Sequence, residues 1–302
     1  MGTLSESRSL RSGFRLLACD LDGTLLDERG QLTPPVCAFL DRVQSRGVEV
    51  VAATGRRLSS ALPLLREARI RGDCVVLNGA VVASIETGRI WRSVCLGDDA
   101  CRSILEVLKS EGFAPLVYSS GEPGLPECTI EQGSVDPTGY IAFYRRYAGD
   151  RLRVVEQVLS ESFAETSRIV THESSQRLCT LGARIEPLAA RLGLRCFQSY
   201  DTALKIHRFE VLHSAATKWE GVKAIAAARA IGLEQVLAVG DDANDVEMLA
   251  GAGHSLAAPQ ATEAARVAAR EKLSGEGPPH LLVIQALERN LLNTNGTLEH
   301  PS

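Results

Sequence analysis

Two aspartates that follow a short apolar run are the first residues whose types and spacing indicate chemistry. Residues 16–19 are small or apolar, Asp20 and Asp22 come directly after them, and Gly23 follows. Side chains two positions apart in an extended segment point the same way. Two carboxylates so close ionise together at low cost only when a cation offsets their repulsion. Mg²⁺ is the natural cation, because it prefers oxygen ligands and shares an oxygen with a bound phosphate.

A second acidic cluster strengthens this interpretation. Taken alone, an Asp-x-Asp pair is more often a turn with solvated carboxylates. Asp241, however, ends another apolar run, and Asn244 and Asp245 follow closely. A third carboxylate at Asp241 would complete a Mg²⁺ site with Asp20 and Asp22, and this favours a phosphoryl-transfer site over a solvated turn.

Residues suited to hold a phosphoryl group also stand in the sequence. Thr54 ends an apolar run and precedes Gly55, so a hydroxyl and a backbone N–H are available to phosphoryl oxygens there. Lys218 could add a cation. Taken alone, the first feature is more often an ordinary Thr-Gly turn and the second a solvated lysine on a helix, so the hypothesis depends on their combination.

The elements that must position these residues alternate between strand and helix. Residues 14–82 show a strand-helix-strand-helix-strand order, with a third strand over 74–84 that turns at Asn78-Gly79. Residues 210–302 return to the same pattern. This order predicts a parallel sheet with helices on both faces. Ligands of such sheets bind outside the carboxyl ends of the strands, and the acidic and Thr-Gly motifs fall there.

The middle of the chain, residues 83–209, is richer in Gly, Pro and Ser. Its pattern predicts an α+β insert between the two halves of the parallel-sheet domain. We expect a core of residues 14–82 plus 210–302, an inserted domain of residues 83–209, and a flexible tail at 1–13. Within the insert we expect helices at 100–109, 152–163 and 186–192, and strand-like runs at 116–118 and 178–181.

Composition excludes several classes of protein. A net charge of −4 argues against a nucleic-acid or membrane-surface partner. No segment has the roughly 18 consecutive apolar residues that a membrane helix needs, and the N-terminus lacks the apolar stretch of a secretory signal. Eight cysteines without a C-x-x-C pair indicate reduced thiols. We therefore expect a cytoplasmic protein that is a monomer or a small homo-oligomer.

The motifs resemble those of a known family. "DLDGTLLD" (20–27), "ATGR" (53–56), "NGA" (78–80), Lys218 and "GDDANDVEML" (240–249) resemble the four motifs of the haloacid dehalogenase (HAD) superfamily of phosphohydrolases. Their order and spacing resemble its Cof-like type IIB branch. The resemblance implies an α/β fold in which a Rossmann-like parallel-sheet core carries an inserted α+β cap domain.

The resemblance also implies catalytic roles. Asp20 would be the nucleophile that forms an aspartyl-phosphate, and Asp22 would protonate the leaving oxygen and later activate water. Mg²⁺ would be held by the Asp20 side chain, the Asp22 backbone carbonyl and Asp241.

Other residues would serve the phosphate and the substrate. Thr54 and Lys218 would bind the transferring phosphoryl group. The resemblance further implies that support for the metal and for Lys218 comes from Asn244 and Asp245, and that the substrate pocket is lined by Gly55, Arg56, Asn78 and Gly79.

Two positions depart from the family pattern. Trp219 stands where glycine is usual after the lysine, and Gln260 stands where an asparagine is expected. The inserted domain offers no sequence that matches a substrate group, so specificity stays open.

The sequence thus predicts an enzyme, a Mg²⁺-dependent phosphatase acting on a small phosphorylated metabolite that resembles a sugar phosphate. One alternative is a phosphomutase or phosphotransferase, which uses the same aspartyl-phosphate and delivers it to a hydroxyl. The other is a protein that only binds such metabolites on the same scaffold.

Overall fold

The structure is a computed structural model that describes residues 13–122, 124–201 and 204–292. The chain divides into two compact units, one of residues 1–54, 63–74 and 222–302, the other of residues 55–62 and 75–221. The tail expected at residues 1–13 lies outside the described residues apart from Gly13. The domain boundaries expected at 83 and 209 stay a prediction.

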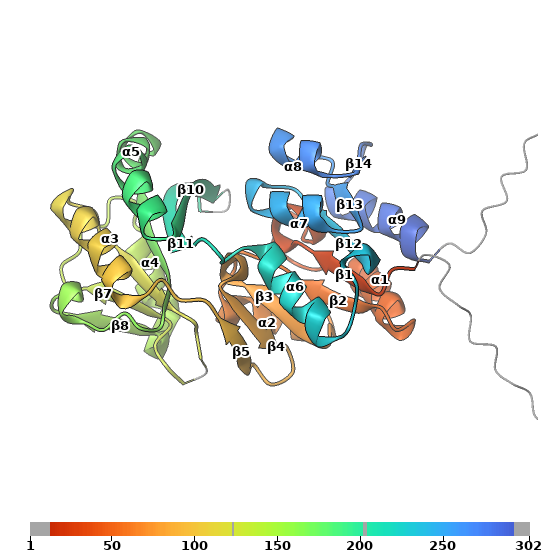
Figure 1. The fold of residues 1–302 in the computed structure, drawn as a ribbon, viewed down its shortest axis with the longest axis horizontal. Helices are drawn as coiled ribbons and strands as arrows, with labels where there is room; N and C mark the ends of the chain where they lie inside the picture. The colour runs from red at the N-terminus through yellow and green to blue at the C-terminus, as the bar shows by residue number, and fades with distance from the viewer. Residues whose placement is uncertain (1–12, 123, 202–203, 293–302) are drawn as a thin grey trace, which may run out of the picture. The chain divides into compact units, whose positions relative to one another are not determined.

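The first unit is built on a parallel sheet with the strand order β14-β13-β12-β1-β2 (Figure 1). Strands β1 and β12 are buried at every position, which explains their continuous apolar sequences. Because β1 is paired in parallel with both β2 and β12, the carboxyl ends of the three strands meet at one edge. The strands are β1 (Leu16–Cys19), β2 (Glu49–Ala52), β12 (Val236–Gly240), β13 (His254–Ala257) and β14 (Glu271–Lys272).

Helices pack around this sheet. The first of them begins with two prolines in its first turn and buries Val36, Phe39, Leu40 and Val43, the helical spacing read from the sequence. The last helix, α9 (Pro279–Leu291), contacts both α1 (Pro34–Ser45) and the turn at Leu21–Leu25 that follows β1. The helices of this unit are α1 (Pro34–Ser45), α7 (Val246–Gly251), α8 (Glu263–Ala268) and α9 (Pro279–Leu291).

Three elements run across the division of the chain. They are α2 (Leu58–Glu67), β3 (Asp73–Val76) and α6 (Lys218–Ala228). The third strand was expected to turn at Asn78-Gly79, and a 3₁₀ turn at Leu77–Gly79 does divide it there. Strand β3 belongs to a three-stranded sheet with the order β3-β4-β5, which corrects the expectation of a third parallel strand at 74–84. The other two strands are β4 (Val81–Ser84) and β5 (Ile90–Ser93).

The second unit contains a six-stranded sheet with the order β10-β11-β9-β6-β7-β8, antiparallel except for the parallel pair β7 and β8 (Figure 1). Its strands are β6 (Leu116–Ser119), β7 (Cys128–Glu131), β8 (Leu152–Val155), β9 (Thr166–Glu173), β10 (Leu194–Asp201) and β11 (Ile206–His213). With the parallel sheet of the first unit, this architecture confirms the predicted fold class, an α/β core with an additional α+β part.

Helices cover both faces of the six-stranded sheet. Val117 and Ile169 pack in one apolar cluster with α3 (Asp98–Ser110) and α5 (Ser175–Arg191). Tyr118 and Val170 pack in another with α4 (Tyr140–Ala148). Alternate strand residues thus serve opposite faces. The helices are α3 (Asp98–Ser110), α4 (Tyr140–Ala148) and α5 (Ser175–Arg191).

Two expectations for this unit were wrong. The segment 152–163, expected as a helix, begins as β8 and continues as a 3₁₀ turn at Val158–Ser160. Pairing of Leu152 with Cys128 on β7 overrides its helical spacing. The strand-like run 178–181 lies inside α5, whose buried residues Leu178, Leu181 and Ile185 recur at helical intervals.

No described helix is long and apolar enough to cross a membrane. All eight cysteines are free thiols, as the sequence predicted.

Candidate active site

Asp20, the first of the predicted catalytic residues, directly follows β1 at the carboxyl edge of the parallel sheet. Its backbone N–H donates to the Val239 carbonyl at 3.0 Å, which extends the pairing of β1 with β12 by one residue. The Asp20 side chain is buried, while Asp22 is exposed in the turn at Leu21–Leu25. The neighbouring Cys19 thiol is no rival nucleophile, because complete burial raises its pKa and keeps it protonated.

The same turn is fitted closely to Asp241. The Thr24 hydroxyl donates to Asp241 Oδ1 at 3.0 Å. Gly23 has a φ of +80°, and a Cβ at this position would lie 2.2 Å from Asp241 Oδ2. Glycine is therefore required twice over at position 23, by its backbone conformation and by the approach of the carboxylate.

Asp245 anchors the segment that carries Asp241. Its Oδ2 accepts hydrogen bonds from the backbone N–H groups of Asp241 at 3.0 Å and Asp242 at 3.1 Å. The side chain is fully buried, and a Cβ on Gly240 would lie 2.5 Å from its Cγ. Asn244, half-buried, stands beside it in the 3₁₀ turn Ala243–Asp245.

Asp20, Asp241 and Asp245 each offer one carboxylate oxygen to a common point, with those oxygens within 4.8 Å of one another. Ionised carboxylates this close repel one another, and a bound cation would offset that repulsion. An all-oxygen donor set fits a hard divalent ion such as Mg²⁺. The sequence placed Asp245 behind the metal, whereas the structure brings it into the carboxylate cluster. A role for Asp22 through its backbone carbonyl stays a prediction.

The four expected substrate-lining residues lie in the second unit, and two of them, Asn78 and Gly79, belong to a tight turn at Leu77–Gly79. Leu77, Asn78 and Gly79 all have a positive φ, of 50°, 55° and 98°. A bulky leucine in this region is a rare, strained conformation. A Cβ on Gly55 would lie 2.8 Å from Asn78 Oδ1, so the structure brings Gly55 and Asn78 together.

The same turn touches the start of α6. A Cβ on Gly79 would lie 1.9 Å from the Thr217 carbonyl oxygen, one residue before Lys218. The Thr217 hydroxyl accepts the Glu220 N–H at 3.0 Å and caps the helix. Lys218 is almost fully buried, and Trp219 is buried as well. The tryptophan thus packs inside the protein at the position where the family usually has glycine.

Thr54 is fully buried just beyond the end of β2, and Arg56 is half-buried in the second unit. The contacts expected among Thr54, Lys218 and the aspartates stay predictions. Thr54 and the aspartates belong to the first unit, and Lys218 belongs to the second. Sequence reasoning gave no role to Thr24. Its position directly after the Asp-x-Asp-Gly stretch was the available signal.

Gln260 has a contact that explains one departure from the family pattern. Its side-chain amide donates to the Gly23 carbonyl. The residue therefore supports the turn that faces Asp241.

A family model described as haloacid dehalogenase-like hydrolase matches residues 17–274. This chain belongs to the haloacid dehalogenase-like hydrolases. The match confirms the resemblance seen in the motifs and the expectation of an enzyme.

Relatives of known name agree with this assignment. Phosphatase YwpJ of Bacillus subtilis (strain 168) is 28% identical over 267 residues, 83% of this chain and 91% of the relative. Pyridoxal phosphate phosphatase YbhA of Escherichia coli (strain K12) is 25% identical over 268 residues, 84% and 91% of the two chains. With the family match, they confirm the expectation of a Cof-like phosphoric monoester hydrolase.

A solved structure shows the same fold. TM0651 from Thermotoga maritima has a TM-score of 0.74 at 21% identity, covering 93% of this chain and 98% of that one.

Proposed function

We propose that this hydrolase is a Mg²⁺-dependent phosphatase that cleaves a small phosphorylated metabolite through an aspartyl-phosphate on Asp20. The observation that carries the proposal is the convergence of the Asp20, Asp241 and Asp245 carboxylates beside the turn at Leu21–Leu25. Those three side chains, with the Asp22 backbone carbonyl, would hold the Mg²⁺. When bound, the ion offsets the charge of the nucleophile and of the phosphoryl oxygens.

The reaction then proceeds in two steps. An Asp20 carboxylate oxygen attacks phosphorus, the bond from phosphorus to the ester oxygen breaks, and Asp22 gives its proton to the leaving oxygen. Asp22, now a carboxylate, takes a proton from water as that water attacks phosphorus. The bond between phosphorus and Asp20 breaks, and inorganic phosphate and free Asp20 are formed.

The remaining site residues hold the phosphoryl group and the rest of the substrate. Thr54 donates its hydroxyl, and Lys218 supplies the positive charge. The strained turn at Leu77–Gly79 supports a substrate-lining role for Asn78 and Gly79, because strained backbone concentrates at functional sites. Gly55, Arg56 and the supporting Asn244 complete the proposed set.

The proposed substrate is a small metabolite that resembles a sugar phosphate. Relatives named as phosphatases, one of them for pyridoxal phosphate, support a small phosphomonoester. Eight free cysteines support a cytoplasmic location. The proposal includes a cap formed by residues 83–209, a core formed by residues 14–82 plus 210–302, and a monomer or small homo-oligomer in solution.

The test is phosphate release from a panel of sugar, nucleotide and cofactor phosphates, with Mg²⁺ or with EDTA. Asp20→Asn should abolish release, while Asp41→Asn, an exposed position on α1, should leave it unchanged. Release that is insensitive to EDTA and to Asp20→Asn would refute the proposed chemistry.

A product assay separates the alternatives. A sugar monophosphate converted to its isomer, without free phosphate, would identify a phosphomutase. Binding without any product would identify a protein that only binds its ligand.

A further inference from the structure

Several buried polar atoms of the second unit have no hydrogen-bond partner among the described residues. Four of them belong to neighbouring side chains, and they are Arg57 Nη1, Tyr144 Oη, Arg168 Nε and His172 Nδ1. Tyr144, Arg168 and His172 are only 3%, 6% and 8% exposed. Nearly all buried polar groups in proteins are hydrogen-bonded, so these atoms need an explanation, and a bound ligand is one.

Tyrosine rings join the first three of these residues. The Arg57 guanidinium lies 4.4 Å from the centroid of the Tyr144 ring, and the Arg168 guanidinium lies 4.8 Å from that of Tyr118. The Tyr118 and Tyr144 rings meet edge to face, with centroids 6.2 Å apart. The two guanidiniums are therefore held against neighbouring aromatic rings.

Tyr140 joins His172 to the same group. The Tyr140 ring stacks on His172 with centroids 3.9 Å apart and lies parallel to the Tyr144 ring at 6.1 Å. Three of the chain's five tyrosines gather here, so its phenol groups are concentrated at this place. We call the group the tyrosine–arginine cluster, and its residues are Arg57, Tyr118, Tyr140, Tyr144, Arg168 and His172.

Arginine charge exceeds carboxylate charge on the β9 and β11 side of the cluster. Arg168 Nη1 donates to Glu210 Oε2 at 2.9 Å, and Arg208 Nε lies 2.9 Å from Glu210 Oε1. Burial alone would raise the pKa of Glu210, but the Arg208 and Arg168 guanidiniums hold it below its ordinary value, so the carboxylate stays charged. Burial, with Arg208 next in effect, lowers the pKa of His172 to about 3, and Asp136 opposes this with the least effect. Two guanidiniums thus face one carboxylate, beside a neutral imidazole.

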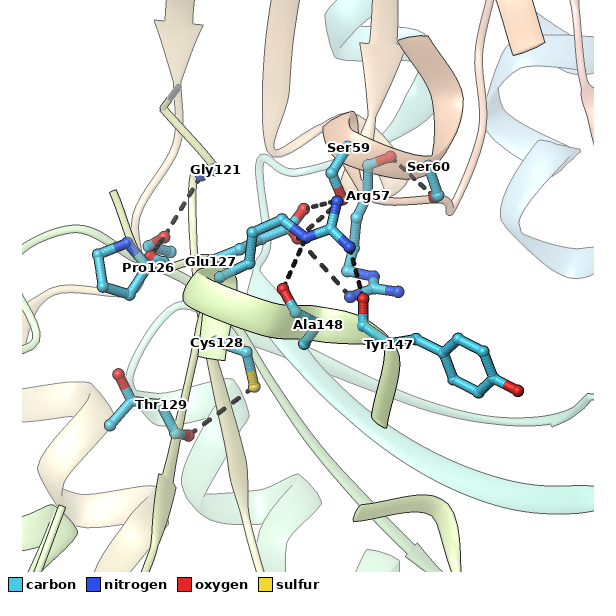
Figure 2. Close-up of polar contacts among 12 residues, drawn as sticks. Arg57, Ser59, Ser60, Gly121, Pro126, Glu127, Cys128, Thr129, Tyr147 and Ala148 are labelled. Carbon is cyan, nitrogen blue, oxygen red and sulfur yellow. Dashed lines mark hydrogen bonds and ion pairs between the residues drawn. The ribbon is translucent and has the colours of Figure 1, made fainter. Parts of the chain in front are cut away.

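The same excess recurs around Glu127. The Glu127 carboxylate accepts from the Ser59 hydroxyl, with both oxygens 2.8 Å from Oγ (Figure 2). Arg57 Nη1 lies 3.7 Å and Arg151 Nε 3.9 Å from Glu127 Oε2, which are ion-pair distances too long for hydrogen bonds. The Arg57 side chain is 21% exposed, so the cluster reaches the protein surface there.

We propose that the tyrosine–arginine cluster binds a second anionic group of the substrate, a carboxylate or a further phosphate, apart from the phosphoryl group that is transferred. Arginine N–H groups only donate, and the Tyr144 hydroxyl can donate as well. Guanidiniums match the oxygens of carboxylates and phosphates better than any other side chain. The inference rests on the proposed function, because it names the class of the substrate of that reaction.

The cluster also touches a residue that is proposed to line the substrate pocket. Arg168 Nη1 donates to the Gly55 carbonyl at 3.2 Å, and Arg57 follows Gly55 by two residues in the chain. A substrate that contacts Gly55 would therefore have the cluster within reach of its non-transferred part.

Matched pairs of phosphomonoesters test the proposal. 3-Phosphoglycerate carries a carboxylate where glycerol 3-phosphate carries a hydroxymethyl group, and fructose 1,6-bisphosphate carries one phosphate more than fructose 1-phosphate. With Mg²⁺, we expect the wild type to favour the member with the second anionic group in at least one pair, about tenfold or more in kcat/KM. We call this ratio the anion preference.

Tyr144→Phe is the decisive variant. It removes the unpartnered hydroxyl and keeps the ring against Arg57. Because a buried hydroxyl without a partner destabilises a protein, we expect an unchanged or higher thermal midpoint, while the anion preference falls about 3- to 10-fold. A purely structural tyrosine would leave the preference as it is. Tyr147→Phe is the matched control, since Tyr147 is also on α4, is 61% exposed and directs its ring away from Glu127 (Figure 2).

Arg168→Met tests the charge. Glu210 keeps Arg208, so the substitution leaves no carboxylate of this pair without a cation. We expect the anion preference to fall about 10- to 100-fold, because hydrogen bonds to charged groups are the stronger ones. The preference compares two substrates of one variant, so a general loss of activity does not change it.

The possible outcomes separate this inference from the proposed function. Phosphate release without any anion preference, or a preference that Tyr144→Phe and Arg168→Met both retain, would overturn the role of the cluster and leave the phosphatase standing. Free glycerate that raises the activity on glycerol 3-phosphate would overturn it too, in favour of a separate effector site.

An enzyme that releases no phosphate from either pair would count against the proposed function. Calorimetric titration with 3-phosphoglycerate and with fructose 1,6-bisphosphate would then decide the role of the cluster. Tighter binding of either to Tyr147→Phe than to Tyr144→Phe would support it, and equal affinities for both would overturn it.

Discussion

Single atoms decide the geometry of the carboxylate cluster. The Gly23 hydrogen allows the turn after Asp20 to meet Asp241, and the Thr24 hydroxyl orients the same carboxylate at 3.0 Å. Asp245 holds its place through two backbone N–H groups. The geometry of the carboxylate cluster therefore depends on Gly23 and Thr24 as well as on the strands β1 and β12.

Gly23→Ala tests this fit. The new methyl group would lie 2.2 Å from Asp241 Oδ2, and Asp241 must move to relieve the clash. We expect at least a tenfold loss of Mg²⁺-dependent phosphate release, on the order of 1.4 kcal/mol in the barrier, measured by steady-state kinetics.

Gly112→Ala is the matched control. Gly112 also has a positive φ, of +76°, but its Cβ would meet nothing within 4 Å. The control therefore shares the backbone strain and lacks the clash. Equal activity in the two variants would show that Asp241 does not depend on the space at Gly23.

His172 predicts an acid sensitivity. Burial, with Arg208 next in effect, lowers its pKa from 6.5 to about 3. Below pH 6.5 the unfolded chain takes up a proton that the folded protein refuses, so stability falls as pH drops towards 3. Above pH 6.5 the residue contributes nothing to the pH dependence. At pH 5 the loss is on the order of 2 kcal/mol.

His172→Phe should remove this loss. The ring stacks on Tyr140 with centroids 3.9 Å apart, and phenylalanine keeps that stacking without a titrating group. We expect the drop in thermal midpoint between pH 7.5 and pH 5 to shrink in the variant. An unchanged drop would show that other groups cause the acid sensitivity.

At the scale of elements, the sequence predicted what depends on local pattern. The strands that end at the aspartates and the first helix, α1, are found because their burial pattern is continuous or strictly periodic. The segment 152–163 failed because pairing with β7 decided its conformation. That contact joins residues distant in sequence, so no local pattern reveals it.

The same limit applies to the site. Asp20 and Asp241 could be found because they directly follow two apolar strands, and Asp245 because it stands four residues after Asp241 in the same polar stretch. The contacts of Arg168 could not be found, because they join it to Gly55 and Glu210 across 113 and 42 residues. One arginine on a strand carries no sequence signal of such contacts.

The start of α6 gives a prediction at this scale. Thr217 caps the helix through the Glu220 N–H at 3.0 Å, directly before Lys218. Thr217→Ala should lower stability by about 1 kcal/mol and raise KM, since the first turn carries the lysine. Thr217→Ser keeps the hydroxyl and should resemble the wild type in thermal unfolding and kinetics. If alanine and serine behave alike, the cap does not hold Lys218.

At the scale of the whole molecule, the chain changes unit beside the residues of the proposed site. It crosses between Thr54 and Gly55, and again between Gly221 and Val222, three residues after Lys218. The carboxylate cluster, by contrast, lies wholly in the first unit. Metal binding should therefore affect the stability of the first unit, whereas the proposed phosphoryl-binding residues Thr54 and Lys218 are divided between the two units.

Mg²⁺ should accordingly stabilise the first unit selectively. A ligand that binds only the folded state adds about 2.7 kcal/mol at a concentration of 100 times its Kd. In scanning calorimetry we expect Mg²⁺ to raise the temperature at which the first unit unfolds, and EDTA to reverse this increase.

Asp245→Asn provides the sharpest variant. Its amide oxygen can still accept hydrogen bonds from the N–H groups of Asp241 and Asp242, while the negative charge is lost. The turn should then survive without metal while the Mg²⁺ shift shrinks, and Asp41→Asn should keep the full shift. A shift of the same size in Asp245→Asn would show that Asp245 is not a ligand of the ion, and a uniform shift of the whole profile would show that the two units unfold together.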